Sequence, residues 1–87
     1  MNKPENVFQV RLNNKYVDRW TVYVSNNESG ETETLCCSDD PDHPQGVFSM
    51  TIGYYISATD EEKSWDDLPK TLKKFIINYL TNEQNVV

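Results

Sequence analysis

The stretch LPKTLKKFIINYL (residues 68–80) decides the fold that this sequence predicts. Its apolar residues recur at intervals of three and four, which is the spacing of one face of an α-helix. The apolar stripe consists of Leu68, Leu72, Phe75, Ile76, Tyr79 and Leu80, and the opposite side carries Lys70, Lys73, Lys74 and Asn78. Ile77 lies off the stripe, near the polar side. Such a helix must cover an apolar surface, so the preceding residues have to supply one.

The segment before the helix has the composition of a helix start. Asp66 or Asp67 can accept hydrogen bonds from free backbone N–H groups, and both favour the positive end of the helix dipole. Pro69 fits the first turn, where no N–H is needed. We therefore expect the helix to begin within residues 64–69.

Four earlier segments alternate as β-strands do. In residues 7–12, Phe8, Val10 and Leu12 share one face. Residues 16–25 follow a hairpin connection and place Trp20, Val22 and Val24 together; further turn residues end this strand at 26–30. A weaker strand runs from residue 31 or 32 to 37, and its acids predict a wet face or an edge position.

The clearest strand is residues 47–56, in which both alternating sets contain apolar side chains. This pattern predicts a central position or cover on both faces, with Gly53 marking a bulge or a close approach. Residues 58–63 are predicted to be an exposed acidic connection. The sequence thus predicts an α+β fold: one domain over residues 1–87, an antiparallel sheet of about four strands under one C-terminal amphipathic helix, and disordered ends at about 1–5 and 82–87.

Charge is segregated along the chain. The formal net charge is −6, and residues 28–67 hold eleven carboxylates but a single cation, Lys63. Such a surface repels nucleic-acid phosphates and anionic lipids, and it suits a basic protein partner. The candidate partner-binding residues are Glu31, Glu33, Asp39, Asp40, Asp42, Asp60, Glu61 and Glu62. A more specific alternative is a nucleic-acid mimic that blocks a DNA-binding protein.

The loop CCSDDPDHPQG (residues 36–46) raises the question of a metal or thiol site. Cys36, Asp42 and His43 are the candidate ligands. The two cysteines are adjacent, so in an extended chain their side chains point to opposite faces and one ion cannot readily take both. The spacing does not match a calcium-binding EF-hand loop either. A metal- or thiol-dependent activity at this loop remains the alternative function, although nearby carboxylates oppose formation of a thiolate.

Motifs for catalysis and for targeting are absent from the sequence. It has no glycine-rich phosphate loop and no nucleophile elbow. We therefore expect a non-enzymatic protein without a cofactor. No apolar run is long enough for a signal peptide or a membrane span, so we expect a cytoplasmic protein with reduced cysteines.

Three blocks resemble a family of small uncharacterised bacterial and tailed-phage proteins. They are residues 18–22 (DRWTV), the pattern S-x-x-P-x-x-P-Q-G-V over residues 38–47, and residues 67–69 (DLP). The family pattern has Tyr where this chain has Trp20, and a Gly-Lys run where this chain has residues 58–63. The resemblance implies a bacterial or phage origin and no catalytic activity.

Self-association is a further possibility. If the third strand forms an exposed edge, it offers unpaired backbone groups to a second copy, and Ile77 offers a small apolar contact. The protein is therefore expected to be a monomer or a homodimer.

Overall fold

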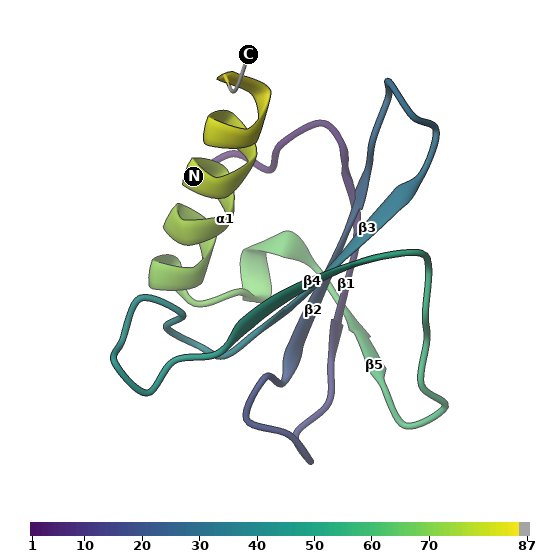
Figure 1. Cartoon of the computed structure of the whole chain (residues 1–87). Coiled ribbons are helices and arrows are strands. Elements are labelled where there is room, and N and C mark those ends of the chain that lie inside the picture. Colours follow the sequence, from purple (N-terminus) through teal and green to yellow (C-terminus); the bar gives the residue numbers. More distant parts are fainter. Residues whose placement is uncertain (86–87) are drawn as a thin grey trace.

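The computed structural model describes the backbone of residues 1–85 and the side chains of residues 1–82. Within this part of the chain, the fold is an antiparallel sheet with a single α-helix across one face (Figure 1). The sheet order is β4-β3-β2-β1-β5. The strands are β1 (Val7–Leu12), β2 (Trp20–Ser25), β3 (Thr32–Cys37), β4 (Phe48–Ile52) and β5 (Glu61–Lys63). The predicted α+β class is confirmed, with one strand more than expected.

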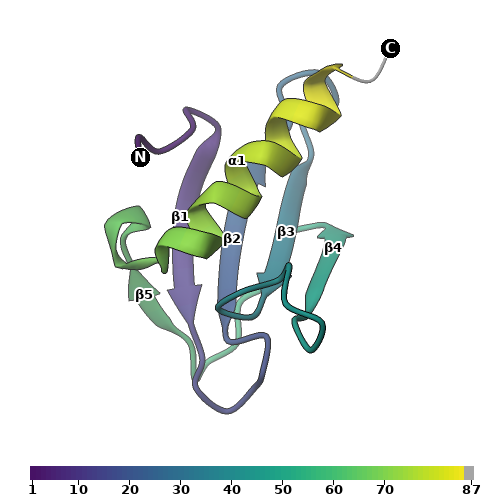
Figure 2. The ribbon, with the colours of Figure 1, turned by 90° about the vertical axis from the view of Figure 1, so that its left-hand side faces the viewer.

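The helix α1 (Lys70–Asn85) crosses one face of the sheet diagonally (Figure 2). We call this face the inner face. Leu72 and Ile76 of α1 are fully buried against the sheet. The strands contribute the buried residues Val7, Val10, Trp20, Val22, Val24, Leu35 and Cys37. The predicted apolar stripe of the helix is therefore the roof of the core. Ile77 is also partly buried against this core, so its expected place near the polar side is wrong.

A short 3₁₀ turn, η1 (Trp65–Asp67), precedes the helix. Ser64, rather than either aspartate, is its N-cap: the Ser64 hydroxyl accepts from the Asp66 N–H at 3.1 Å. The Asp67 carboxylate accepts in return from the Ser64 N–H at 2.9 Å, which completes a capping box. Trp65 is buried, and its indole N–H donates to the Met1 carbonyl at 3.3 Å. The start of the chain is thus tied to the start of the helical region.

A β-bulge in β1 changes the predicted face of Phe8. Val7 pairs with Val24 and Gln9 pairs with Tyr23, so Phe8 is an extra residue between two pairs. The bulge brings Val7 onto the inner face with Val10. Phe8 lies on the opposite face, which we call the outer face, where its ring is 6.2 Å from that of Tyr23. The alternation alone placed Phe8 with Val10, which is wrong.

The position of β3 also differs from the expectation. It lies between β2 and β4 instead of at an edge. Glu33 is 4% exposed and stands opposite Val24 in the register, so an acidic residue here does not mark a wet face.

The edges of the sheet are β4 and β5. The strand that looked central, β4, has a partner on one side and exposes most of its residues. Gly53 ends it with a φ of 130°. Part of the expected acidic connection is β5, which pairs with β1.

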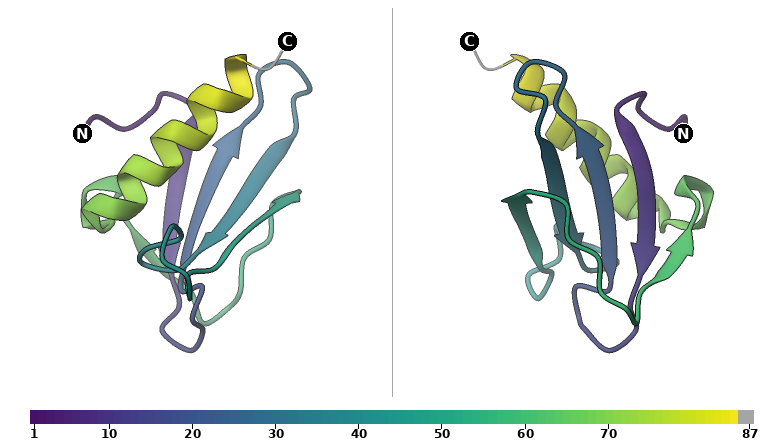
Figure 3. Two further views of the ribbon diagram at one scale, coloured as in Figure 1. Left: turned by 60° about the vertical axis from the view of Figure 1, so that its left-hand side comes forward. Right: turned by 90° about the vertical axis from the view of Figure 1, so that its right-hand side faces the viewer.

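Residues 53–60, called here the crossing segment, join the two edge strands. Because β4 and β5 lie at opposite edges, this segment passes over the outer face (Figure 3). The sequence predicts disordered ends at about residues 1–5 and 82–87. At the C-terminal end, α1 extends to Asn85, and residues 86–87 lie outside the described part of the chain.

Candidate binding pocket on the outer face of the sheet

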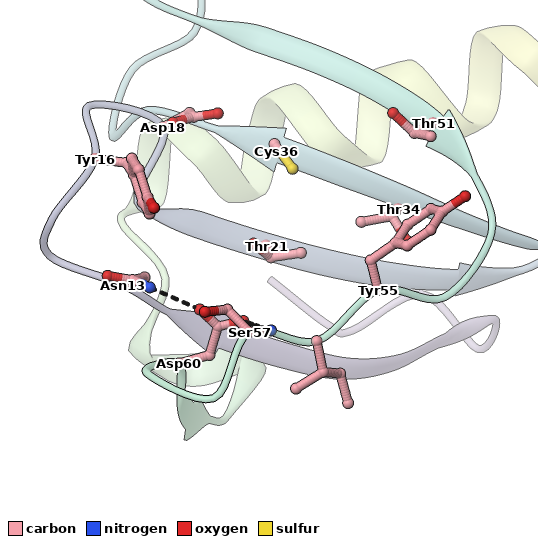
Figure 4. A pocket seen from close by; sticks show the side chains of 11 residues that line it. Asn13, Tyr16, Asp18, Thr21, Thr34, Cys36, Thr51, Tyr55, Ser57 and Asp60 are labelled. Carbon is pink, nitrogen blue, oxygen red and sulfur yellow. Dashed lines mark hydrogen bonds between the residues drawn. The ribbon is translucent and has the colours of Figure 1, made fainter.

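A pocket of about 450 Å³ lies between the outer face and the crossing segment. Its floor consists of side chains from three neighbouring strands: Thr21 of β2, Thr34 and Cys36 of β3, and Thr51 of β4 (Figure 4). These residues alternate with Val22, Leu35 and other core residues. The same period of two that fills the inner face therefore places small polar groups on the outer one.

Asp60 organises one wall of the pocket. Its carboxylate accepts from the Asn13 side-chain amide at 2.9 Å and from the Ser57 N–H at 3.0 Å. Arg11 donates to the Asp60 carbonyl at 3.1 Å, and its Nε lies 3.8 Å from the carboxylate. The Asp60 side chain is only 9% exposed, so this acid is used within the protein.

Hydrogen bonds hold the crossing segment on the sheet. The Tyr23 hydroxyl donates to the Tyr55 carbonyl, and the Thr34 hydroxyl donates to the Gly53 carbonyl, both at 2.5 Å. The Tyr54 hydroxyl donates to the Gln9 side chain. Burial raises the pKa of Tyr23 to about 12, with a smaller contribution from the negative charge of Asp60. Tyr23 therefore remains a neutral donor at neutral pH.

Gly53 is required where the crossing segment leaves β4. A Cβ atom at this position would lie 2.7 Å from the ring of Tyr55, and the positive φ disfavours any L side chain. The sequence predicted a bulge or a close approach by another element at Gly53; the structure shows a close approach, made by the ring of Tyr55 two residues further along the chain.

The two cysteines lie on opposite faces of β3, as the alternation predicted. Cys37 is fully buried in the inner core, and burial raises its pKa to about 12. Cys36 lines the pocket; partial burial and then the charge of Asp18 raise its pKa above the usual 9.0. Both thiols are therefore protonated at neutral pH, which opposes nucleophilic chemistry.

Asp42 and His43 lie in the exposed loop between β3 and β4. His43 accepts from the Gln45 N–H through Nδ1 at 3.1 Å, and its carbonyl accepts from the Gly46 N–H at 2.7 Å. These bonds describe a turn. Among the side chains that the structure describes (residues 1–82), no three from His, Cys, Asp or Glu gather closely enough to hold a metal ion.

Two of the predicted acidic residues, Glu33 and Asp60, are not available to a partner. Glu33 is 4% exposed, and Asp60 is bonded to Asn13. Asp39 accepts from Arg19 Nε and from the Trp20 indole, both at 2.8 Å. The acids of this set that are exposed are Glu31, Asp39, Asp42, Glu61 and Glu62, while Asp40 is partly exposed.

Asp18 is the acid that the sequence analysis missed. It lies at the rim of the pocket with Tyr16, and Tyr55 lies toward the other end (Figure 4). Within the described residues, the Asp18 side chain makes no hydrogen bond and no ion pair. Asp18 lies outside the acidic residues 28–67, and it belongs to the loop between β1 and β2, where no alternating pattern indicates the direction of a side chain. The alternating threonines were visible in the sequence, but the crossing segment that closes the pocket was not.

Comparisons with known proteins leave the family open. No protein-family model, no curated protein and no solved structure matches the chain. In the described part of the chain, α1 is too short and too polar to cross a membrane.

Proposed function

We propose that the protein is a non-enzymatic binding protein whose outer-face pocket takes a basic side chain of a protein partner. The observation that carries this proposal is the carboxylate of Asp18, which lies at the pocket rim without a hydrogen-bond or ion-pair partner among the described residues. The arginines nearest in the fold are used elsewhere, because Arg11 binds Asp60 and Arg19 binds Asp39. A cation from outside would complete the site.

The lining groups suit an ammonium or a guanidinium group. The ring of Tyr16, which lies at the rim with Asp18 and is 60% exposed, can contribute a cation–π contact of about 0.5–1 kcal/mol. The threonine hydroxyls of the floor offer acceptor oxygens for N–H donors.

The overall charge favours the same class of partner. With a net charge of −6, and with Glu31, Asp42, Glu61 and Glu62 exposed, the protein attracts basic proteins and speeds their encounter at low salt. We therefore place the basic partner's anchoring side chain at Asp18 and assign the exposed acids to long-range attraction. The resemblance to bacterial and phage proteins makes a bacterial lysate the source in which to search.

The thiol of Cys36 provides a direct test. An oligolysine peptide should slow alkylation of Cys36 in the pocket, whereas a matched oligoglutamate peptide should not. Asp18→Asn should abolish this protection. Asp66→Asn is the matched control: it removes one negative charge at an exposed position outside the pocket, and it should leave the protection unchanged.

The same variants identify a natural partner. Immobilised protein should retain a basic protein from the lysate at low salt. It should release this protein in 0.5 M salt, because the Debye length there is only about 5 Å and interactions between exposed charges are screened beyond it. Equal retention by Asp18→Asn, or no protection of Cys36 by oligolysine, would contradict the proposal.

A further inference from the structure

The free edge of β4 differs from the other edge of the sheet. Residues 43–59 contain no Asp, Glu, Lys or Arg, and β4 lies in the middle of this uncharged stretch. In contrast, β5 has the sequence Glu-Glu-Lys and spans three residues. Short, charged edge strands resist pairing with other chains, and β4 has neither protection.

The hydrogen-bond ladder determines which backbone groups of β4 are free. Ser38 N–H donates to the Val47 carbonyl at 2.9 Å, and Gly53 N–H donates to the Thr32 carbonyl at 2.7 Å. Because residues of an antiparallel strand alternate in direction, Ser49 and Thr51 also face β3. The backbone groups of Phe48, Met50 and Ile52 therefore face outward. The Tyr55 hydroxyl donates to the Ile52 carbonyl, but the bond is long at 3.4 Å.

Side chains on the inner side of this edge form an apolar strip. Met50 is 39% exposed and Ile52 is 44% exposed, beyond the part of the sheet that α1 covers. The strip continues into the molecule through Phe48, whose ring centroid lies 4.9 Å from that of Phe75 and 5.1 Å from that of Tyr79. A strand added at this edge would extend the core of the protein.

We propose that the edge strand β4 pairs antiparallel with β4 of a second copy, which makes a two-fold dimer with one continuous sheet. The sequence Phe-Ser-Met-Thr-Ile is complementary to its own reverse. With Met50 on the two-fold axis, Phe48 faces Ile52 of the second copy and Ser49 faces Thr51. Apolar side chains thus meet on the inner side and hydroxyl side chains meet on the outer side.

Charge favours a second copy over a different partner at this edge. A basic strand would find no carboxylate among residues 43–59, and an acidic strand would find no cation. The same self-pairing at β5 would place Glu62 opposite Glu62 of the second copy, although Glu61 would face Lys63, and it would span three residues instead of five. The dimer and the proposed binding function can be tested separately, because Met50, the residue that the dimer test changes, does not line the outer-face pocket, although Thr51 of the same strand does.

The oligomeric state tests the proposal. Light scattering from low micromolar to near-millimolar concentration should show a mass rising from 10.1 kDa to twice that value. Met50→Lys should raise the dissociation constant of the dimer at least tenfold, because it places two positive charges opposite each other at the two-fold axis. Val17→Lys is the matched control: Val17 is 72% exposed in the β1–β2 connection, so this variant adds the same charge away from β4 and should leave the dimer intact.

A mixing experiment tests the register. Met50→Lys and Met50→Glu should each be monomeric alone and should form a dimer when mixed, because residue 50 of one copy faces residue 50 of the other. Circular dichroism of each variant establishes that it is folded. A wild-type protein that remains monomeric at every concentration overturns the proposal and leaves the edge to a strand of another protein. A dimer that survives in Met50→Lys overturns it as well.

Discussion

The two faces of the sheet are covered by different physical means. On the inner face, α1 buries apolar side chains such as Leu72 and Ile76 completely. On the outer face, the crossing segment is held by hydrogen bonds from Tyr23 and Thr34 to its backbone and by the Tyr54 ring, which lies 4.9 Å from that of Tyr23. This segment leaves Tyr54 and Tyr55 about half exposed or more. The inner face therefore provides the apolar core, and the outer face retains an open pocket.

The largest expected effect is a difference in reactivity between the two adjacent thiols, because Cys36 lies on the outer face and Cys37 on the inner face. Cys37 is closed in the core, so a thiol reagent reaches it only when the protein unfolds, at a cost of about 5–15 kcal/mol. Cys36 should react in the folded state, slowly at pH 7 and faster as the pH rises toward its raised pKa. Mass spectrometry of alkylated peptides separates the two sites. Equal labelling of both thiols in the folded protein would remove the distinction between the faces.

Truncation on each face gives the next largest effect. Leu72→Ala should lower the free energy of unfolding by about 2–5 kcal/mol, because it leaves a cavity between α1 and the sheet. Tyr55→Ala should cost less than about 1 kcal/mol, since Tyr55 is 62% exposed and its carbonyl, not its ring, accepts the bond from Tyr23. Urea unfolding monitored by circular dichroism compares the two variants. A larger loss in Tyr55→Ala would show that the crossing segment is part of the core.

The smallest effect concerns Asp39, which ties the loop after β3 to both β2 and α1. Arg19 and then Trp20 bind its carboxylate and lower its pKa below 3.8; its carbonyl accepts from Thr71 at 3.0 Å. A lowered pKa stabilises the fold above pH 3.8, and this stabilisation is lost as the pH falls through the folded-state pKa. Wild type should therefore lose slightly more thermal stability than Asp39→Asn between pH 5 and about pH 3. Identical losses would mean that this exposed pair contributes nothing.

The regular parts of the inner face were predictable, because side chains buried on one face of a helix or strand recur in the sequence at a fixed spacing. Residues 68–80 repeat at helical spacing and Trp20, Val22 and Val24 alternate, so their cover could be inferred from the sequence. The bulge at Phe8 was not predictable, because one extra residue reverses the face without altering composition. The acidic residue Glu33 was also misleading, because it alternates onto the same side of β3 as Leu35 and is 4% exposed.

The outer face and the edges depend on contacts that leave little trace in the sequence. The apolar pattern of β4 reads the same whether a neighbouring strand covers it or solvent does, so its edge position was missed. β5 has no apolar period, because it joins β1 through backbone pairing. The pocket exists because the crossing segment connects these two strands, and no single segment predicts it.

The pairing of β5 with β1 also has a kinetic consequence. Arg11 and Asp60 are bonded across 49 positions of the chain, whereas the other strands are joined by hairpins between neighbours in sequence. Closing such a long loop costs more entropy than closing a hairpin, which delays the final strand during folding. On the ribosome, β1 must wait with one flank open until most of the chain has been synthesised.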